Sequence, residues 1–335
     1  MPHTAQAQPK KLQEIFISKN DPEDLRLGDI ILRGKAIADN EKDVDIAIIG
    51  IPQDVGIERN GGRIGAAQAP DAIRRALYKL TPNFGEAALK KDNFTIIDLG
   101  DMAVEGLALE DIHRRQQEIV SALLKQGVIP VVLGGGHDIA FPNGAALGTL
   151  DKDFGVINLD AHPDVRPLLH GKRGHSGSPF RQLLEGQPHL KSLVEFGIQP
   201  FAASPQHLQY VRDKGQTVTM LQDIRDTGFK KSFEAALKKV SAKKQNVFVS
   251  FDMDSVTSAY APGVSAPSAI GFSGDEICSA AYLAGEKAYV KIIDIVEVNP
   301  NFDIDGRTAK LAALVAAHFM AGVYQRKNGK SKGIF

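Results

Sequence analysis

The sequence predicts an α/β fold: a single three-layer α-β-α domain around a mostly parallel sheet of about eight strands. Apolar runs typical of strands alternate with amphipathic helical patterns over most of the 335 residues. The runs are apolar at nearly every position, as in parallel strands that are buried on both faces. No repeat or Pro/Gly/Ser-rich linker divides the chain. We therefore expect an N-terminal extension (1–40), one domain (41–326) and a C-terminal tail (327–335).

Short apolar, mostly β-branched runs mark the expected strands, and longer runs with helical periodicity mark the expected helices. The strands are expected at 46–51, 94–99, 129–133, 156–160, 193–197, 217–221, 247–251 and 290–296. The helices are expected at 70–79, 109–126, 137–148, 205–213, 230–242, 274–285 and 307–324. Ser204 before Pro205 predicts an N-cap followed by the first helical position, and Ser273 with Glu276 predicts a capping box.

Composition excludes several classes of protein. Lys plus Arg equals Asp plus Glu at 40 each, so no net field attracts nucleic acid or an anionic membrane. The single cysteine, Cys278, cannot form an intrachain disulfide, and no apolar run reaches the roughly 18 residues of a membrane span. We expect a cytoplasmic protein with no nucleic-acid or membrane partner.

Chemically active side chains follow four of the expected strands. They lie in Gly134–Asp138, Asp160–Asp164, Asp252–Asp254 and Glu297–Pro300. Ligands of parallel α/β sheets bind at the carboxyl ends of the strands, so these segments are expected to meet. Taken singly, each segment also fits an ordinary turn, and a lone histidine after a strand is often structural.

Six side chains in these segments form an expected metal site: His137, Asp160, His162, Asp164, Asp252 and Asp254. Four carboxylates without cations would repel one another, whereas two divalent ions would balance their charge. Oxygen donors with only two imidazoles and no thiolate favour Mn²⁺ over a structural zinc site. Two ions about 3.5–4 Å apart can bridge a water and deliver hydroxide at neutral pH. The set therefore predicts hydrolysis at an electrophilic carbon.

The motifs Gly-Gly-Gly-His-Asp, Asp-Ala-His-Pro-Asp, Ser-Phe-Asp-Met-Asp-Ser and Val-Glu-Val-Asn-Pro occur in that order. Together they resemble the ureohydrolase (arginase/agmatinase) family from about residue 44 to 324. The resemblance implies an arginase-like fold, cleavage of a C–N bond in guanidino or amidino groups, and two Mn²⁺ per subunit. It also implies two ligand sets: His137, Asp160, Asp164 and Asp252 for one ion, and Asp160, His162, Asp252 and Asp254 for the other, with Asp160 and Asp252 bridging.

Within that family, three stretches resemble the formimidoylglutamases, at residues 59–66, 176–182 and 261–267. The resemblance implies conversion of N-formimidoyl-L-glutamate and water to L-glutamate and formamide, in histidine degradation. Candidate substrate-binding residues on the first two stretches are Asn60, Arg63, Ser176 and Arg181. Arg181 is the weaker anchor, because it also fits a solvated charge on a helix.

Arg166 lies two residues after Asp164, where it is expected to reach the rim of the site. Arginases place Asn at this position. A guanidinium fork suits bidentate binding of a carboxylate and would oppose a cationic tail such as that of agmatine. We therefore expect a small substrate with an amidino group and a carboxylate. The alternative is that Arg166 supports a ligand or is a surface charge.

The catalytic candidates are Glu297, His175 and Asp164. By resemblance, Glu297 would pair with the amidinium group and orient its carbon, although a salt-bridging role is the alternative. The histidine that arginases carry in a His-Gly-x-Pro motif aligns with Ser176. His175 or His170 could act as the acid instead, or could be exposed loop residues. Classical arginase activity is therefore not expected.

Two other functions stay open. The first is another amidinohydrolase, which would release urea from a guanidino acid, arginine or agmatine. The second is a metal-binding homologue without turnover, which the intact ligand set argues against. Relatives commonly form trimers or hexamers, so the resemblance also implies a homo-oligomer.

Overall fold

The computed structural model describes residues 12, 14–34, 43–84, 94–242 and 245–328. Within them a single sheet of nine strands forms the middle layer, and every strand pair is parallel. Across the sheet the strands are β1 (Leu32–Arg33), β3 (Ile96–Asp101), β2 (Ile46–Gly50), β4 (Ile129–Leu133), β9 (Val290–Val296), β8 (Asn246–Asp252), β5 (Phe154–Leu159), β6 (Leu190–Ile198) and β7 (Thr217–Met220). The predicted three-layer α/β fold is confirmed, with a sheet that is wholly rather than mostly parallel.

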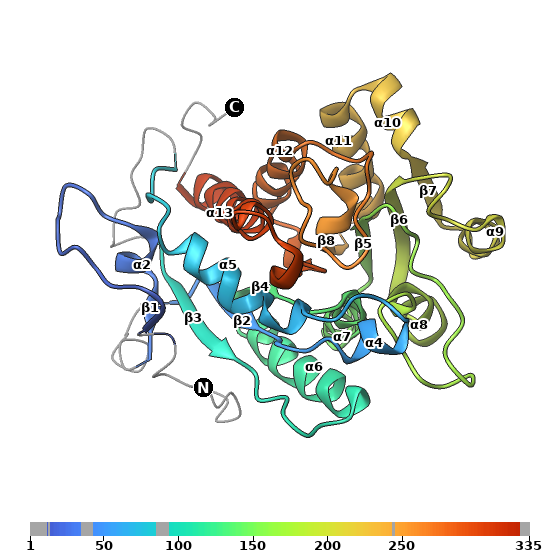
Figure 1. The fold of residues 1–335 in the computed structure, drawn as a ribbon. Coiled ribbons are helices and arrows are strands. Elements are labelled where there is room, and N and C mark those ends of the chain that lie inside the picture. The colour runs from blue at the N-terminus through green and yellow to red at the C-terminus, as the bar shows by residue number, and fades with distance from the viewer. Residues whose placement is uncertain (1–11, 13, 35–42, 85–93, 243–244, 329–335) are drawn as a thin grey trace.

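Helices cover both faces of this sheet (Figure 1). One core contains residues of α5 (Ala69–Leu77), α10 (Leu221–Thr227), α11 (Phe229–Val240), α12 (Gly274–Gly285) and α13 (Arg307–Asn328). The opposite core contains residues of α6 (Leu109–Lys125), α7 (Ala140–Gly148), α8 (Pro179–Gly186) and α9 (Pro205–Asp213). Two shorter helices are α2 (Leu27–Ile30) and α4 (Val55–Arg59). None of the described helices carries an apolar stretch long enough to cross a membrane.

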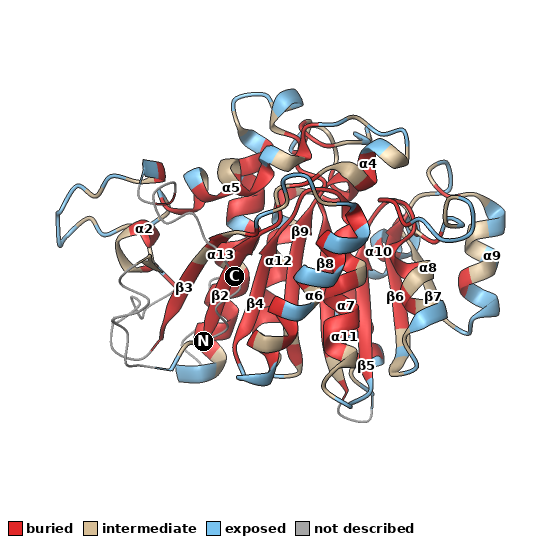
Figure 2. Cartoon of the chain, turned by 90° about the horizontal axis from the view of Figure 1, so that it is seen from below, coloured by how far each residue is buried: buried red, intermediate tan, exposed pale blue. Residues whose placement is uncertain are grey.

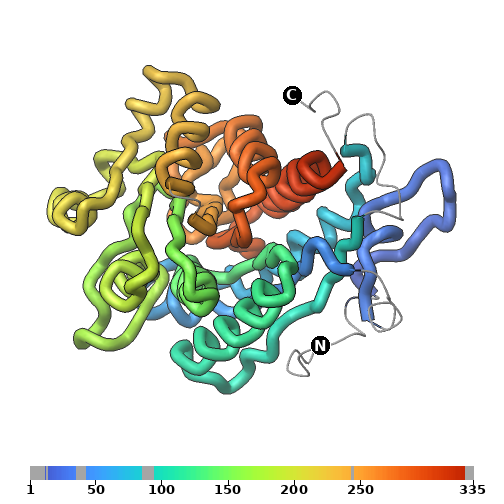
Figure 3. The backbone as a smooth tube through the Cα atoms, turned by 180° about the vertical axis from the view of Figure 1, so that it is seen from behind, coloured from blue at the N-terminus to red at the C-terminus, as the bar shows by residue number. Residues whose placement is uncertain are grey.

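The central strands are apolar at nearly every position because both of their faces are buried (Figure 2). In β5, Val156 packs into the core under α6–α9, whereas Ile157 and Leu159 pack into the other core. On the face of the sheet that α5, α10 and α11 also cover, α12 and α13 lie side by side (Figure 3). They approach closely at Gly285 and Gly322, where an added Cβ would clash with the backbone of the facing helix.

All eight expected strands and all seven expected helices are present, with ends that match or shift by at most four residues. Ser204 caps α9 by accepting a hydrogen bond from the His207 amide, and the Ser273–Glu276 capping box begins α12. Three helices of five to eight residues, α4, α8 and α10, were not predicted, because each is too short to show a helical period. The expected helix at 137–148 begins as a 3₁₀ turn, His137–Ile139, before α7.

Part of the segment expected to be an extension joins the domain. Leu27 and Ile31 are buried in the core, and β1 pairs with β3. At the other end α13 continues to Asn328, past the expected boundary at residue 326. The remaining residues of the expected extension and tail, 1–11, 13, 35–40 and 329–335, lie outside the described part of the chain.

The strand order brings the four expected site segments together. β4, β9, β8 and β5 are consecutive neighbours in the sheet, although they are far apart in the sequence. Because these strands are parallel, their carboxyl ends meet at the same edge. That edge holds the functional site.

Candidate metal centre

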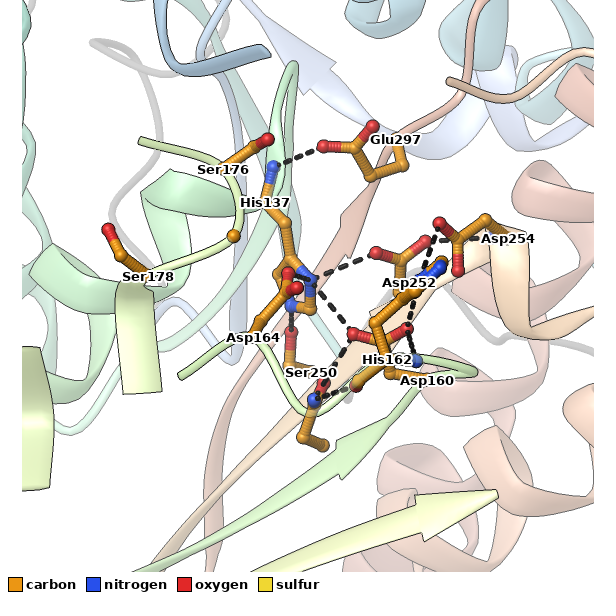
Figure 4. Close-up of polar contacts among 12 residues, drawn as sticks. His137, Asp160, His162, Asp164, Ser176, Ser178, Ser250, Asp252, Asp254 and Glu297 are labelled. Carbon is orange, nitrogen blue, oxygen red and sulfur yellow. Dashed lines mark hydrogen bonds and ion pairs between the residues drawn. The ribbon is translucent and has the colours of Figure 1, made fainter. Parts of the chain in front are cut away.

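All six expected ligands converge at the carboxyl ends of three strands (Figure 4). His137 begins the turn after β4, the segment from Asp160 to Asp164 follows β5, and Asp252 and Asp254 lie at and just after the end of β8. Their donor atoms form two groups, and within each group all donor atoms lie within 4.8 Å of one another. The first group is His137, Asp160, Asp164 and Asp252, and the second is Asp160, His162 and Asp254.

Asp160 is shared by both groups and presents one oxygen to each imidazole. Its Oδ2 lies 3.3 Å from His137 Nδ1, and its Oδ1 lies 3.3 Å from His162 Nδ1. Around His137 Nδ1, Asp164 Oδ2 lies at 3.0 Å and Asp252 Oδ2 at 2.9 Å. Asp254 Oδ2 lies 3.3 Å from His162 Nδ1. This arrangement is that of two adjacent sites joined by one carboxylate.

Asp252, expected to bridge, belongs to the first group only. Its Oδ2 faces His137, while its Oδ1 accepts a hydrogen bond of 2.8 Å from the Asp254 amide. The first group holds the four ligands expected for one ion, and the second holds three of the four expected for the other. The assignment of ligands to ions, with Asp252 as a bridge, stays a prediction.

Burial makes the cluster a poor place for uncompensated charge. Burial, with Asp254 and Asp160 nearby, raises the pKa of Asp252 well above its ordinary value. Burial and Asp160 also raise the pKa of Asp254 to about 6, although His162 opposes this. Within the site, Asp254 Oδ1 is buried without a hydrogen-bond partner, and His137 Nδ1 is surrounded by three carboxylate oxygens. Convergent oxygen and imidazole donors, with one carboxylate oxygen unpaired, fit a pair of divalent cations.

A buried chain of hydrogen bonds on the side of the ring away from the other ligands fixes the tautomer of His137. The Ser250 hydroxyl donates to Asp294 Oδ1 at 2.6 Å, so Ser250 Oγ, 3.0 Å from His137 Nε2, must accept a hydrogen bond from that nitrogen. The Asn143 amide donates to the other oxygen of Asp294 at 2.8 Å. This buried chain leaves the lone pair of Nδ1 for a metal ion and orients the ring toward it.

Two site residues have strained backbones. Asp164 has φ 41° and Glu297 has φ 65°, a region that residues other than glycine rarely adopt. Glu297 Oε1 accepts a hydrogen bond of 2.7 Å from the His137 amide, which fixes this carboxyl beside the first group. Burial raises the pKa of Glu297 to about 8.

Three of the expected substrate-binding residues form a hydrogen-bonded series. Arg166 is exposed, and its Nη1 donates to Asn60 Oδ1 at 3.3 Å. The Asn60 amide in turn donates to Ser176 Oγ at 3.1 Å. One exposed guanidinium is thus held near the loop that carries Asp164.

Arg63 and Arg181 are engaged with the protein itself. The guanidinium of Arg63 donates to the carbonyls of Val264 and Ser265. Arg181 Nε donates to the Val165 carbonyl at 2.8 Å, and its Nη1 pairs with Glu185 at 3.1 Å. Both side chains fasten loops, so binding a substrate would require them to leave these contacts.

His175 is buried with both ring nitrogens occupied. Its Nδ1 accepts a hydrogen bond of 3.2 Å from the Gly177 amide, so its Nε2 is the nitrogen that donates to the Pro167 carbonyl at 3.1 Å. A proton shuttle at this position would have to break a loop contact. His170 belongs to the same loop and has φ 51°.

Several polar residues that support the ligands had no role assigned from sequence. Asn158 and Ser250 each precede an aspartate ligand by two residues, Asp160 and Asp252 respectively. This spacing places them on the same strand face as the ligand and could have marked them. Glu195, on the neighbouring β6, could be found only from the strand pairing.

The fold and the paired donor sets define the chain as a metal-dependent hydrolase of the α/β class. A model of the arginase family matches residues 44–322, and the chain belongs to that family. Formimidoylglutamase from Klebsiella pneumoniae (strain 342) is 33% identical over 305 residues, which cover 89% of this chain and 92% of that relative.

Solved structures agree with this assignment. Trypanosoma cruzi formiminoglutamase with Mn²⁺ is 38% identical, with TM-score 0.81 over 90% of this chain and 99% of that chain. Formimidoylglutamase from Bacillus subtilis is 26% identical, with TM-score 0.83 over 94% of this chain and 96% of that chain. Proclavaminate amidino hydrolase from Streptomyces clavuligerus is also 26% identical, with TM-score 0.74 over 85% of this chain and 93% of that chain.

Proposed function

We propose that this chain is a manganese-dependent formimidoylglutamase, which hydrolyses N-formimidoyl-L-glutamate to L-glutamate and formamide. The observation that carries the proposal is the pair of donor groups joined at Asp160, with the carboxyl of Glu297 held beside them. The curated and structural relatives named formimidoylglutamase support the choice of substrate. The Mn²⁺ named for the Trypanosoma cruzi protein supports the choice of metal.

Two divalent cations in these sites supply Lewis acidity, which makes water a nucleophile at neutral pH. The protein's part is to hold the six ligands in place and to orient the substrate. Glu297 accepts a hydrogen bond from the His137 amide through Oε1, and we assign its carboxyl group to the N–H groups of the amidino group. A carboxyl fixed in this way turns the amidino carbon toward the nucleophile.

Counted from the neutral amidine, the reaction forms a C–O bond from water and breaks the C–N bond to the glutamate nitrogen. One water proton moves to that nitrogen, and the other moves to the imino nitrogen, which becomes the NH2 group of formamide. We assign the proton transfer to Asp164. Its side chain is 13% exposed, the most of the four aspartate ligands, so it is the carboxylate best able to reach the substrate. The leaving group is then the neutral amine of glutamate.

We assign recognition of the substrate carboxylate to Arg166. Its exposed guanidinium, steadied by Asn60, offers parallel N–H donors that suit a carboxylate. Ser176 supports Asn60 and so contributes indirectly. An acidic tail is favoured over a cationic one, which Arg166 would repel.

Product identification tests this proposal. Purified protein loaded with Mn²⁺ is offered N-formimidoyl-L-glutamate and, separately, a panel of guanidino acids, arginine and agmatine. Formamide and glutamate in equal amounts are expected. Urea from the panel would instead identify another amidinohydrolase, and no turnover by fully loaded protein would indicate a silent homologue. A cytoplasmic homo-oligomer is also proposed, and light scattering would test the assembly.

A further inference from the structure

A row of four polar side chains crosses the sheet beneath the metal centre. Glu195 on β6 pairs with Asn158 on β5, Asn158 with Ser250 on β8, and Ser250 with Asp294 on β9. Each of the four residues has 0% of its surface exposed. Directly paired residues of neighbouring strands share a face, so this row is continuous. It divides into two halves that reach different metal ligands.

Asn158 and Glu195 form the half of the row that reaches Asp160. Asn158 Nδ2 lies 2.8 Å from Glu195 Oε2 and 3.2 Å from Asp160 Oδ2, with a longer contact of 3.4 Å to the His162 carbonyl. An amide nitrogen carries two hydrogens, so the two shorter contacts use both. Glu195 thereby turns the amide so that its second N–H faces the metal ligand.

These contacts fix the plane of the Asp160 carboxylate. Asp160 Oδ1 accepts a hydrogen bond of 2.7 Å from the His162 amide, while Oδ2 accepts from Asn158. With one N–H on each oxygen, one oxygen remains toward His162 and the other toward His137. A carboxylate held in this orientation can supply one oxygen to each of the two donor groups.

The fold itself gains little from this pair. Asn158 Oδ1 and Glu195 Oε1 are buried with no hydrogen-bond partner within the described chain, and such atoms destabilise a folded protein. Their neighbours on the same strand faces, such as Val156 and Leu193, belong to an apolar core that would accept aliphatic side chains. The pair therefore lowers the stability of the fold. Core packing gives no reason for these two residues, whereas support of a metal ligand does.

We propose that Asn158 and Glu195 are positioning residues that hold the shared ligand Asp160 in its bridging orientation. The proposal rests on the two-metal site of the proposed function. The other half of the row differs from this pair. Ser250 and Asp294 support His137, which belongs to the first donor group only. Loss of Asn158 should therefore weaken the binding of both ions, whereas loss of Ser250 should weaken mainly the binding of one.

The test compares Asn158→Leu with the control Ser250→Ala in the full-length protein. Leucine has nearly the shape of asparagine but no donor. Metal-free protein is titrated with Mn²⁺, thermal unfolding of the metal-free protein is recorded, and electron paramagnetic resonance reports the spin-coupled Mn²⁺ pair.

In Asn158→Leu the affinity for both ions should fall by about 10–100-fold and the coupled signal should decrease, as expected for loss of an outer-shell partner. Its unfolding temperature should be unchanged or higher. Ser250→Ala should weaken one of the two binding steps.

Glu195 provides a second pair of variants that does not depend on Asn158→Leu folding. Glu195→Gln keeps an oxygen that accepts from Asn158, so its Mn²⁺ affinity should remain near that of the wild type. Glu195→Leu removes the acceptor and should lower the affinity in the same direction as Asn158→Leu. Equal affinities in Glu195→Gln and Glu195→Leu would overturn the proposal.

Other outcomes separate this proposal from the proposed function. Wild-type affinity for both ions in Asn158→Leu overturns the positioning role, even if the enzyme turns over formimidoylglutamate. A loss of metal-free stability with unchanged Mn²⁺ affinity also overturns it, because the residue would then be structural. Wild-type protein that binds no Mn²⁺ refutes the proposed function and this inference together. Wild-type protein that binds two ions but turns over nothing refutes only the function.

Discussion

Loading the metal centre should release protons, because the two histidine ligands hold them in the metal-free protein. For His137, burial alone would lower the pKa, but Asp252, Asp160 and Asp164 outweigh it and raise the pKa well above 6.5. For His162, Asp254 and Asp160 likewise raise the pKa well above its ordinary value. We therefore expect both rings to be imidazolium at pH 7 in the metal-free protein. A metal ion needs the unprotonated nitrogen, so each site must expel a proton.

The magnitude follows from this count. Two imidazolium rings give a release of about two protons per pair of ions. The overall binding constant for the pair should then rise at least about 100-fold per pH unit, or roughly 2.7 kcal/mol. The binding constant should stop rising with pH only when the pH exceeds the raised pKa values of the two rings. Activity at limiting Mn²⁺ should accordingly fall as the solution is acidified.

Isothermal titration calorimetry measures this release directly. The same Mn²⁺ titration at pH 7, in two buffers with different ionisation enthalpies, gives the number of protons released. The control His162→Gln should release about one proton fewer, since only His137 then carries a ring proton. A release near zero in the wild type, or an identical release in the control, would refute the reasoning about the two rings.

Three further substitutions test separate parts of the account. Arg166→Ala should raise KM for formimidoylglutamate about tenfold with little change in kcat, because an exposed charged hydrogen bond to the substrate is lost; an unchanged KM would place the carboxylate elsewhere. Glu297→Gln should lower kcat by about 100-fold or more while both Mn²⁺ ions still bind, since Glu297 orients the substrate and is not a ligand; loss of metal would contradict that role. Arg74→Leu should lower the free energy of unfolding, measured in urea, by about 3–5 kcal/mol. The reason is that Asp98, 2.8 Å from Arg74 Nε, would become a buried charge without a counter-ion. A loss below about 1 kcal/mol would show that the charge of Asp98 is compensated in another way.

Strands that are buried on both faces could be predicted from the sequence almost to the residue. β4 and β9 begin and end where their apolar runs do. β1 could not be predicted, because Leu32–Arg33 is too short to show any pattern and pairs with β3 alone. Its place depends on a tertiary contact at the edge of the sheet.

The metal ligands were predictable because each chemically distinct residue follows an apolar strand. Their division between the ions stays a prediction: Asp252 lies with the first donor group only, and its Oδ1 accepts a hydrogen bond from the Asp254 amide. The partners of Arg63, Arg181 and His175 depend on loop conformations that no sequence period encodes.

The supporting row beneath the ligands depends on sheet order. Ser250 lies between Asn158 and Asp294 because β8 lies between β5 and β9. Sequence order puts β6 and β7 between β5 and β8 along the chain, so it gives no hint of this pairing. The pattern of an amide or hydroxyl two residues before an aspartate is visible in the sequence, but its partners are not.

Anomalous diffraction at the manganese edge, from a crystal grown with Mn²⁺, tests the central claim most directly. The account predicts two adjacent peaks, one among His137, Asp160, Asp164 and Asp252 and the other among Asp160, His162 and Asp254. A single peak, or peaks that lie away from Asp160, would contradict it.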